Sequence, residues 1–176
     1  MKRSVVILLA VLLFCGCIKD SVKGSLLRVG DKLPDFELVL DDGTLLSDDM
    51  LRGDVSVVMF FNTSCPDCRQ TLPHMQRIYD DYLEKGVRFV FVSREESADD
   101  VEAYWQKNGY NMPYSAQADR KIYELFAQEG IPRIYVSDRY GVIRCVFTDY
   151  PVPVYEDIAS AIDLLIGVQI PRLRSK

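Results

Sequence analysis

Two mostly apolar runs constrain the fold of this chain more than any other feature. They cover 55–61 and 87–92, and each is interrupted by a single polar residue, so neither shows the regular alternation of a half-exposed strand. A segment with helical spacing of apolar residues follows each run, at 66–84 and at 99–107. Because strands buried on both faces need helices on both sides, this order predicts an α/β fold with a mixed central sheet.

Turn residues divide the rest of the chain into further elements. Asp41-Asp42-Gly43 predicts an N-terminal β-hairpin, because glycine accepts a positive φ. Ser97 is placed to cap the second helix, and Gly130 to end a third. The expected elements are hairpin strands at 36–40 and 44–46, a helix from Asp119, strands at 134–136 and 142–147, and a last helix from Val154 to its stop at Gly167.

Composition and charge exclude several classes of function. The 176 residues carry 21 Lys and Arg against 26 Asp and Glu, a formal net charge of -5, with no basic run. Since phosphate neutralisation carries much of the affinity for nucleic acids, we expect no nucleic-acid partner. The single histidine, His74, argues against zinc sites and histidine-dependent triads.

The sequence of the N-terminal residues is typical of an export signal. Lys2 and Arg3 precede an apolar stretch at 5–14 that would rise about 15 Å as a helix, too short for a bilayer core of roughly 30 Å. Its end, Gly16-Cys17, resembles a bacterial lipobox, which implies lipidation of Cys17. The expected organisation is a lipoprotein signal peptide at 1–16, a tether at 17–27, one domain at 28–167 and a tail at 168–176.

The main chemical signal is Cys65-Pro66-Asp67-Cys68, placed between the first buried strand and the first helix. Such a position puts Cys65 at a helix N-terminus, whose partial positive charge and free N–H groups favour a thiolate. Pro66 suits the first helical position, where the N–H it lacks would have no partner. Cys68 follows one turn later, close enough to attack a mixed disulfide at Cys65.

Several motifs in order resemble the TlpA/ResA-like branch of the thioredoxin superfamily. They are Val29-Gly30-Asp31-Lys32-Leu33-Pro34-Asp35-Phe36, the stretch from Phe60 to Arg69, and Gly130-Ile131-Pro132 with the segment up to Gly141. The resemblance implies a thioredoxin-like three-layer fold and an extracytoplasmic thiol–disulfide oxidoreductase without a cofactor. It also implies protein disulfides or dithiols as substrates, a membrane electron donor, and a reductive direction.

The same resemblance assigns roles to residues. Cys65 would be the attacking thiol, Cys68 the resolving thiol, and Pro132 a cis-proline facing them. Three positions depart from the family pattern: Ser64 where Trp is usual, Thr71 where many members have Glu, and Met59 where thioredoxins have a buried Asp. In the family, the two acids that are missing here assist proton transfer. Asp67 is then the one carboxylate inside the motif. We expect Asp67 and Pro66 to tune the reactivity of the two thiols.

Other interpretations of the same residues stay open. The cysteine pair could form a disulfide that only locks a loop, which would make the protein a non-enzymatic binding module. A metal site would need two further ligands, and His74 is poorly placed to be one. A peroxidase of the peroxiredoxin kind would require Pro and Thr where Val58 and Asn62 stand. Cys145 alternates with apolar neighbours along a strand, which predicts a core position.

Overall fold

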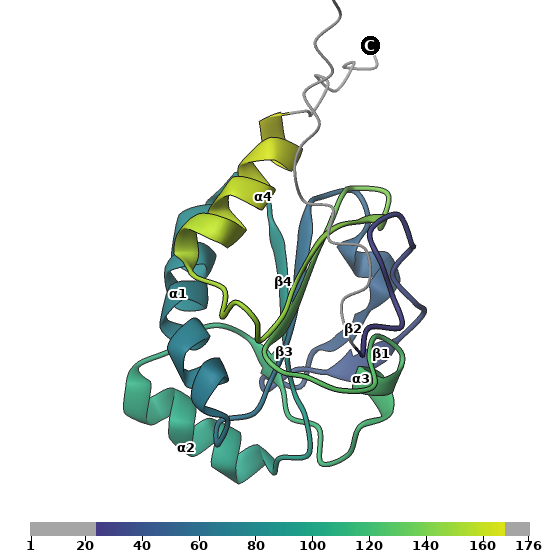
Figure 1. Cartoon of the computed structure of the whole chain (residues 1–176). Coiled ribbons are helices and arrows are strands. Elements are labelled where there is room, and N and C mark those ends of the chain that lie inside the picture. Colours follow the sequence, from purple (N-terminus) through teal and green to yellow (C-terminus); the bar gives the residue numbers. More distant parts are fainter. Residues whose placement is uncertain (1–23, 168–176) are drawn as a thin grey trace, which may run out of the picture.

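A five-stranded sheet, ordered β5-β4-β3-β6-β7, forms the centre of the computed structural model, which describes residues 24–167 (Figure 1). Strands β3, β4 and β5 run parallel, whereas β6 and β7 are antiparallel to their neighbours. The predicted mixed sheet is therefore confirmed. Its strands are β3 (Ser56–Phe61), β4 (Arg88–Ser93), β5 (Tyr114–Ser115), β6 (Arg133–Ser137) and β7 (Ile143–Phe147).

Helices cover both faces of this sheet. One face carries α1 (Pro66–Tyr82), α2 (Ala98–Asn108) and α4 (Tyr155–Gly167), and the other carries α3 (Lys121–Glu124) with the hairpin β1–β2 (Figure 1). Neighbouring residues of β3 show the division, because side chains alternate along a strand. Phe61 packs against Trp105 of α2 with ring centres 4.9 Å apart, whereas Phe60 packs against Tyr123 of α3 at 5.4 Å.

The central strand β3 is completely buried, which explains its apolar sequence. Its residues from Val57 to Phe61 have no exposed surface, and its one polar member, Ser56, exchanges a hydrogen bond of 2.5 Å with Ser137 of β6. A buried hydroxyl without such a partner would cost free energy, so this pairing makes Ser56 compatible with the core. The strand consequently delivers its carboxyl end, and the cysteine motif after it, to a fixed position.

The predicted hairpin and helices form, with shifted ends. Strands β1 (Glu37–Val39) and β2 (Leu45–Ser47) pair antiparallel, and a 3-10 turn, η1 (Asp48–Leu51), follows them. Helix α1 ends at Tyr82, and the 3-10 turn η2 (Leu83–Lys85) follows directly. Ser97 caps α2 as predicted, since its side chain accepts a hydrogen bond from the Asp100 N–H.

Two elements differ from the sequence prediction. The helix expected from Asp119 to Gly130 is only four residues long, because the chain after it pairs with the N-terminal segment instead. There the N–H groups of Leu26 and Leu27 both donate to the carbonyl of Phe126. The short strand β5, at the edge of the sheet, was not predicted.

The expected signal peptide, the lipidation site Cys17 and the C-terminal tail lie outside the described residues. Within 24–167, no helix is both long and apolar enough to cross a membrane.

Candidate active site

The cysteine motif begins α1, and a short network of hydrogen bonds fixes the loop before it. Cys65 is the N-cap residue with an extended backbone, and Pro66 occupies the first turn. The side-chain carbonyl of Asn62 accepts hydrogen bonds from the N–H of Ser64 at 2.8 Å and from its hydroxyl at 2.5 Å. The N–H of Cys65 donates to the Asn62 backbone carbonyl at 3.1 Å. The loop therefore presents Cys65 in one defined orientation.

The two thiols of the motif lie in different environments. Cys65 is partly exposed, whereas Cys68 has no exposed surface, and neither is in a disulfide. Burial raises the pKa of the Cys68 thiol far above its ordinary value, although the Asn62 N–H beside it acts in the opposite direction. Because only a thiolate attacks a disulfide, this difference favours Cys65 as the thiol that meets an external partner.

The loop before β6 lies against the exposed thiol. The Cys65 Sγ is 3.5 Å from the backbone carbonyl of Ile131, to which it donates a hydrogen bond. The peptide bond between Ile131 and Pro132 is cis, as the sequence predicted. Pro132 thus belongs to the segment that contacts Cys65, while its role in docking a substrate stays a prediction.

A buried arginine that was not predicted as a site residue, Arg133, forms hydrogen bonds to the loop before β6. Arg133 is 1% exposed, and its guanidinium donates to the carbonyl of Glu129 at 2.6 Å and to that of Gly130 at 3.5 Å. The hydroxyl of Tyr123 donates to the same Gly130 carbonyl at 2.8 Å. Hydrogen bonds from a charged guanidinium are among the stronger ones, so these two side chains stabilise the loop that contacts Cys65.

A buried carboxylate forms hydrogen bonds to Thr63, two residues before the cysteine motif. Glu96 is 9% exposed and accepts hydrogen bonds from the Thr63 N–H at 3.0 and 3.2 Å, and also from the Thr63 hydroxyl. The Arg69 Nε donates to the Thr63 carbonyl at 2.5 Å. Sequence analysis missed Glu96, because a pair such as Glu95-Glu96 resembles a solvated surface and only the fold brings it to Thr63.

Two of the three positions that depart from the family pattern, Thr71 and Met59, are buried and structural here, whereas Ser64 is exposed. Thr71 is fully buried, and its hydroxyl lies 3.1 Å from the carbonyl of Asp67 and 3.3 Å from that of Pro153. Met59 belongs to the apolar core. Neither side chain titrates, so neither can transfer a proton during thiol exchange. Asp67 is partly exposed in the first turn of α1.

The remaining candidate residues lie apart from the motif. Cys145 is a buried residue of β7, as predicted. His74 lies within α1 and is partly exposed. Among residues 24–167 no group of three or more His, Cys, Asp or Glu side chains is arranged to hold a metal ion.

Comparison with known proteins agrees with this geometry. Residues 29–146 match the profile of the AhpC/TSA family, which is more than half of the chain. The thiol-disulfide oxidoreductase ResA of Halalkalibacterium halodurans is 26% identical over 124 residues, covering 70% of each chain. ResA of Oceanobacillus iheyensis is 29% identical over 149 residues, covering 81% of this chain and 77% of the relative.

A solved structure agrees as well. The thiol:disulfide interchange protein of the thioredoxin family from Chlorobium tepidum superposes with a TM-score of 0.69 at 25% identity, covering 80% of this chain and 99% of the other. The chain therefore belongs to the AhpC/TSA family, among its thioredoxin-like thiol–disulfide oxidoreductases.

Proposed function

We propose that the protein is an extracytoplasmic, lipid-anchored reductase of protein disulfides that uses Cys65 and Cys68. The observation that carries the proposal is the unequal placement of the two thiols. Cys65 is accessible at the helix entrance, whereas Cys68 is buried one turn behind it. A reductase needs this asymmetry, because the attacking thiol must reach a large substrate and the resolving thiol must not compete with it.

The proposed reaction has two exchange steps. The Cys65 thiolate attacks one sulfur of the substrate disulfide, which forms a mixed disulfide and releases the other substrate sulfur as a thiolate. Cys68 then loses its proton and attacks the Cys65 sulfur, which forms the Cys65–Cys68 disulfide and releases the second substrate thiolate. Two protons from the protein thiols end on the substrate, which gains two electrons. An external dithiol donor at the membrane returns the protein to its reduced form.

The protein contributes orientation at both steps. The Ile131 carbonyl, 3.5 Å from the Cys65 sulfur, marks the loop along which we propose that the substrate chain docks, with Pro132 facing the thiols. The Asn62 N–H stabilises a charge on Cys68 when that thiol ionises. No cofactor is needed, because thiol exchange moves electrons between sulfur atoms only.

The proposed location and direction rest on other observations. The basic start, the short apolar stretch and Gly16-Cys17 support export and lipidation. Outside the cytoplasm a cysteine pair tends to become oxidised, so a reductase there depends on a membrane electron donor. The reductive direction rests by analogy on the family resemblance of the sequence motifs.

Turnover with a chemical reductant tests the proposal. The reduced protein should catalyse reduction of a protein disulfide such as those of insulin by excess dithiothreitol, and Cys65→Ser should abolish that catalysis. Cys145→Ala, which removes a thiol outside the motif, should keep it. No acceleration by the wild-type protein would favour the alternative, a binding module in which the disulfide only locks the loop.

A further inference from the structure

A groove begins one residue before the proposed nucleophile and follows α2. Its volume is about 480 Å³, enough for one or two side chains, and Ser64 forms part of its wall. Because Ser64 directly precedes Cys65 in the chain, the groove lies beside the cysteine motif. Ser64 is itself exposed. We call this hollow the α2 groove.

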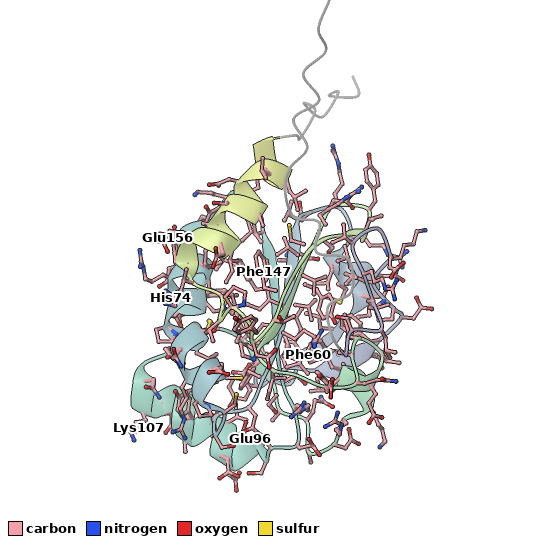
Figure 2. The ribbon with its side chains drawn as sticks, in the orientation of Figure 1. Phe60, His74, Glu96, Lys107, Phe147 and Glu156 are labelled. Carbon is pink, nitrogen blue, oxygen red and sulfur yellow. The ribbon has the colours of Figure 1, made fainter. Side chains whose placement is uncertain are left out.

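The floor and the end of the α2 groove have different chemistry. Ala103 and Tyr104 are the apolar side chains of its lining. Glu95, Glu96 and Asp100 gather at the end next to Thr63, whereas Lys107 lies seven residues beyond Asp100, about 10 Å along the helix. Figure 2 labels Glu96 and Lys107 near opposite ends of α2. The acidic end is therefore the one beside the cysteine motif.

The three carboxylates at this end differ in what they already bind. Glu96 is engaged by Thr63, and Glu95 is paired with Arg120 at 3.1 Å. Asp100 accepts a hydrogen bond of 2.6 Å from the Ser97 hydroxyl. Among the described residues no Lys or Arg nitrogen lies within 4.0 Å of Asp100 in an ion pair. Asp100 is thus an acid without a cationic partner at the wall of a partly apolar groove.

We propose that the α2 groove binds a lysine or arginine side chain that flanks the reactive cysteine of the protein substrate. Such a side chain has an apolar stem, which suits Ala103 and Tyr104, and a cationic head, which suits Asp100. The inference rests on the proposed function, because it assigns substrate selection to a surface that matters only if Cys65 attacks a substrate chain.

The proposal predicts selectivity in the first exchange step. A basic residue next to the substrate cysteine would be held in the groove while its neighbour meets the Cys65 sulfur, whereas an acidic residue would meet like charge. We expect reduction of the basic substrate to be faster on the order of tenfold, which corresponds to about 1.4 kcal/mol. The ratio should fall as ionic strength rises, since salt screens exposed charges.

Three synthetic peptides provide the test. They share one neutral sequence, carry a single cysteine as a mixed disulfide with 2-mercaptoethanol, and differ only in having Arg, Gln or Glu beside that cysteine. The reduced full-length protein is mixed with each peptide, and the second-order rate constant for release of the peptide thiol is measured. The expected order of rates is Arg, then Gln, then Glu.

Matched variants on the same helix separate the groove from overall charge. Asp100→Asn removes the unpaired carboxylate and should reduce the Arg-to-Glu ratio at least twofold. Glu102→Gln changes the net charge equally but lies in a different hollow, so it should leave the ratio as in the wild type. Ala103→Trp should fill the groove and abolish the preference. Ala98→Trp, also on the other side, should not.

Each outcome has a distinct meaning. Equal rates for the three peptides in the wild type would overturn the inference while leaving the proposed function intact. Equal loss of selectivity in Asp100→Asn and Glu102→Gln would also overturn it, because net charge would then explain the preference. Failure of the wild type to reduce any peptide would contradict the proposed function itself.

Discussion

At the scale of single residues, the burial of Cys68 has a measurable consequence for stability. Its pKa is raised in the folded reduced protein, so folding favours the neutral thiol. That stabilisation is complete below the ordinary pKa of the unfolded chain, 9.0, and is lost as pH rises above it. The loss should approach about 1.4 kcal/mol per pH unit, because the unfolded chain releases a proton that the folded protein keeps.

Urea unfolding of the reduced protein from about pH 8 to about pH 10 measures this effect. The free energy of unfolding should fall more steeply for the wild type than for Cys68→Ala, whose tyrosines titrate in the same way. Oxidised wild-type protein, in which the Cys68 sulfur cannot ionise, provides the control. Identical slopes for the reduced wild type and Cys68→Ala would show that the buried thiol does not resist ionisation.

Asp67 gives a second prediction at this scale. It places a carboxylate in the first turn of α1, between the two cysteines, where the helix N-terminus stabilises negative charge. A thiolate nearby should be disfavoured by that charge, so the reduced form should be disfavoured as well. Asp67→His should raise the reduction potential by about 20 mV, given about 30 mV for each 1.4 kcal/mol.

Equilibration with glutathione measures that potential. Asp80→His, a change of the same kind on an exposed residue near the C-terminal end of α1, should leave the potential unchanged. A potential that stays constant or falls in Asp67→His would mean that Asp67 does not tune the pair.

Local pattern predicted the cysteine motif, and the family resemblance implied the cis-proline, but neither predicted the residues that support them. Cys65-Pro66-Asp67-Cys68 is recognisable because its parts are neighbours in sequence. Glu96 reaches Thr63 from 33 residues away, and Arg133 meets carbonyls that only the folded loop places around it. A charged residue beside an apolar strand normally indicates the surface, and its burial depends on partners that no local pattern shows.

At the scale of elements, the packing of α1 and α2 determines where the cysteine motif lies. The Thr71 hydroxyl contacts the Pro153 carbonyl, which ties α1 to the segment before α4. Helix α2 approaches the same end of the sheet and contributes the wall of the α2 groove. The position of α2 therefore affects both the loop at Thr63 and the surface beside Ser64.

Removing the cap of α2 should test how much local chemistry stabilises it. Ser97→Ala deletes the acceptor for the Asp100 N–H, so we expect a loss of about 1 kcal/mol in the free energy of unfolding. Ser160→Ala is the matched control, because Ser160 is exposed inside α4 and its hydroxyl bonds only to the carbonyl four residues earlier. Denaturant unfolding measures both, and equal effects would contradict the capping role.

Elements that depend on distant partners were the ones the sequence analysis misjudged. The helical pattern after Asp119 is cut short because Phe126 pairs with Leu26 and Leu27, a segment about one hundred residues earlier. Strand β5 has two residues, and it forms only because β4 offers a free edge. By contrast, β3 and β4 were predictable, since burial on both faces shows directly in their composition.

At the scale of the whole molecule, attachment to a membrane would decide which substrates the site can meet. We expect the mature chain to begin at Cys17 with an acylated N-terminus when the full sequence is expressed in a bacterial host. Intact-mass measurement of the membrane fraction should show a diacyl or triacyl addition, and Cys17→Ser should remove both the addition and the membrane association. An unmodified chain that starts elsewhere would contradict lipid anchoring.

The proposed mechanism makes one claim above all: Cys65 attacks a substrate disulfide, and Cys68 then releases the substrate. Mass spectrometry of each variant after mixing with a peptide disulfide tests this most directly. Cys68→Ser should accumulate a stable mixed disulfide at residue 65, because the resolving thiol is gone. Cys65→Ser should form none, since Cys68 is buried and its pKa is raised. Trapping in Cys65→Ser, or none in Cys68→Ser, would contradict the claim.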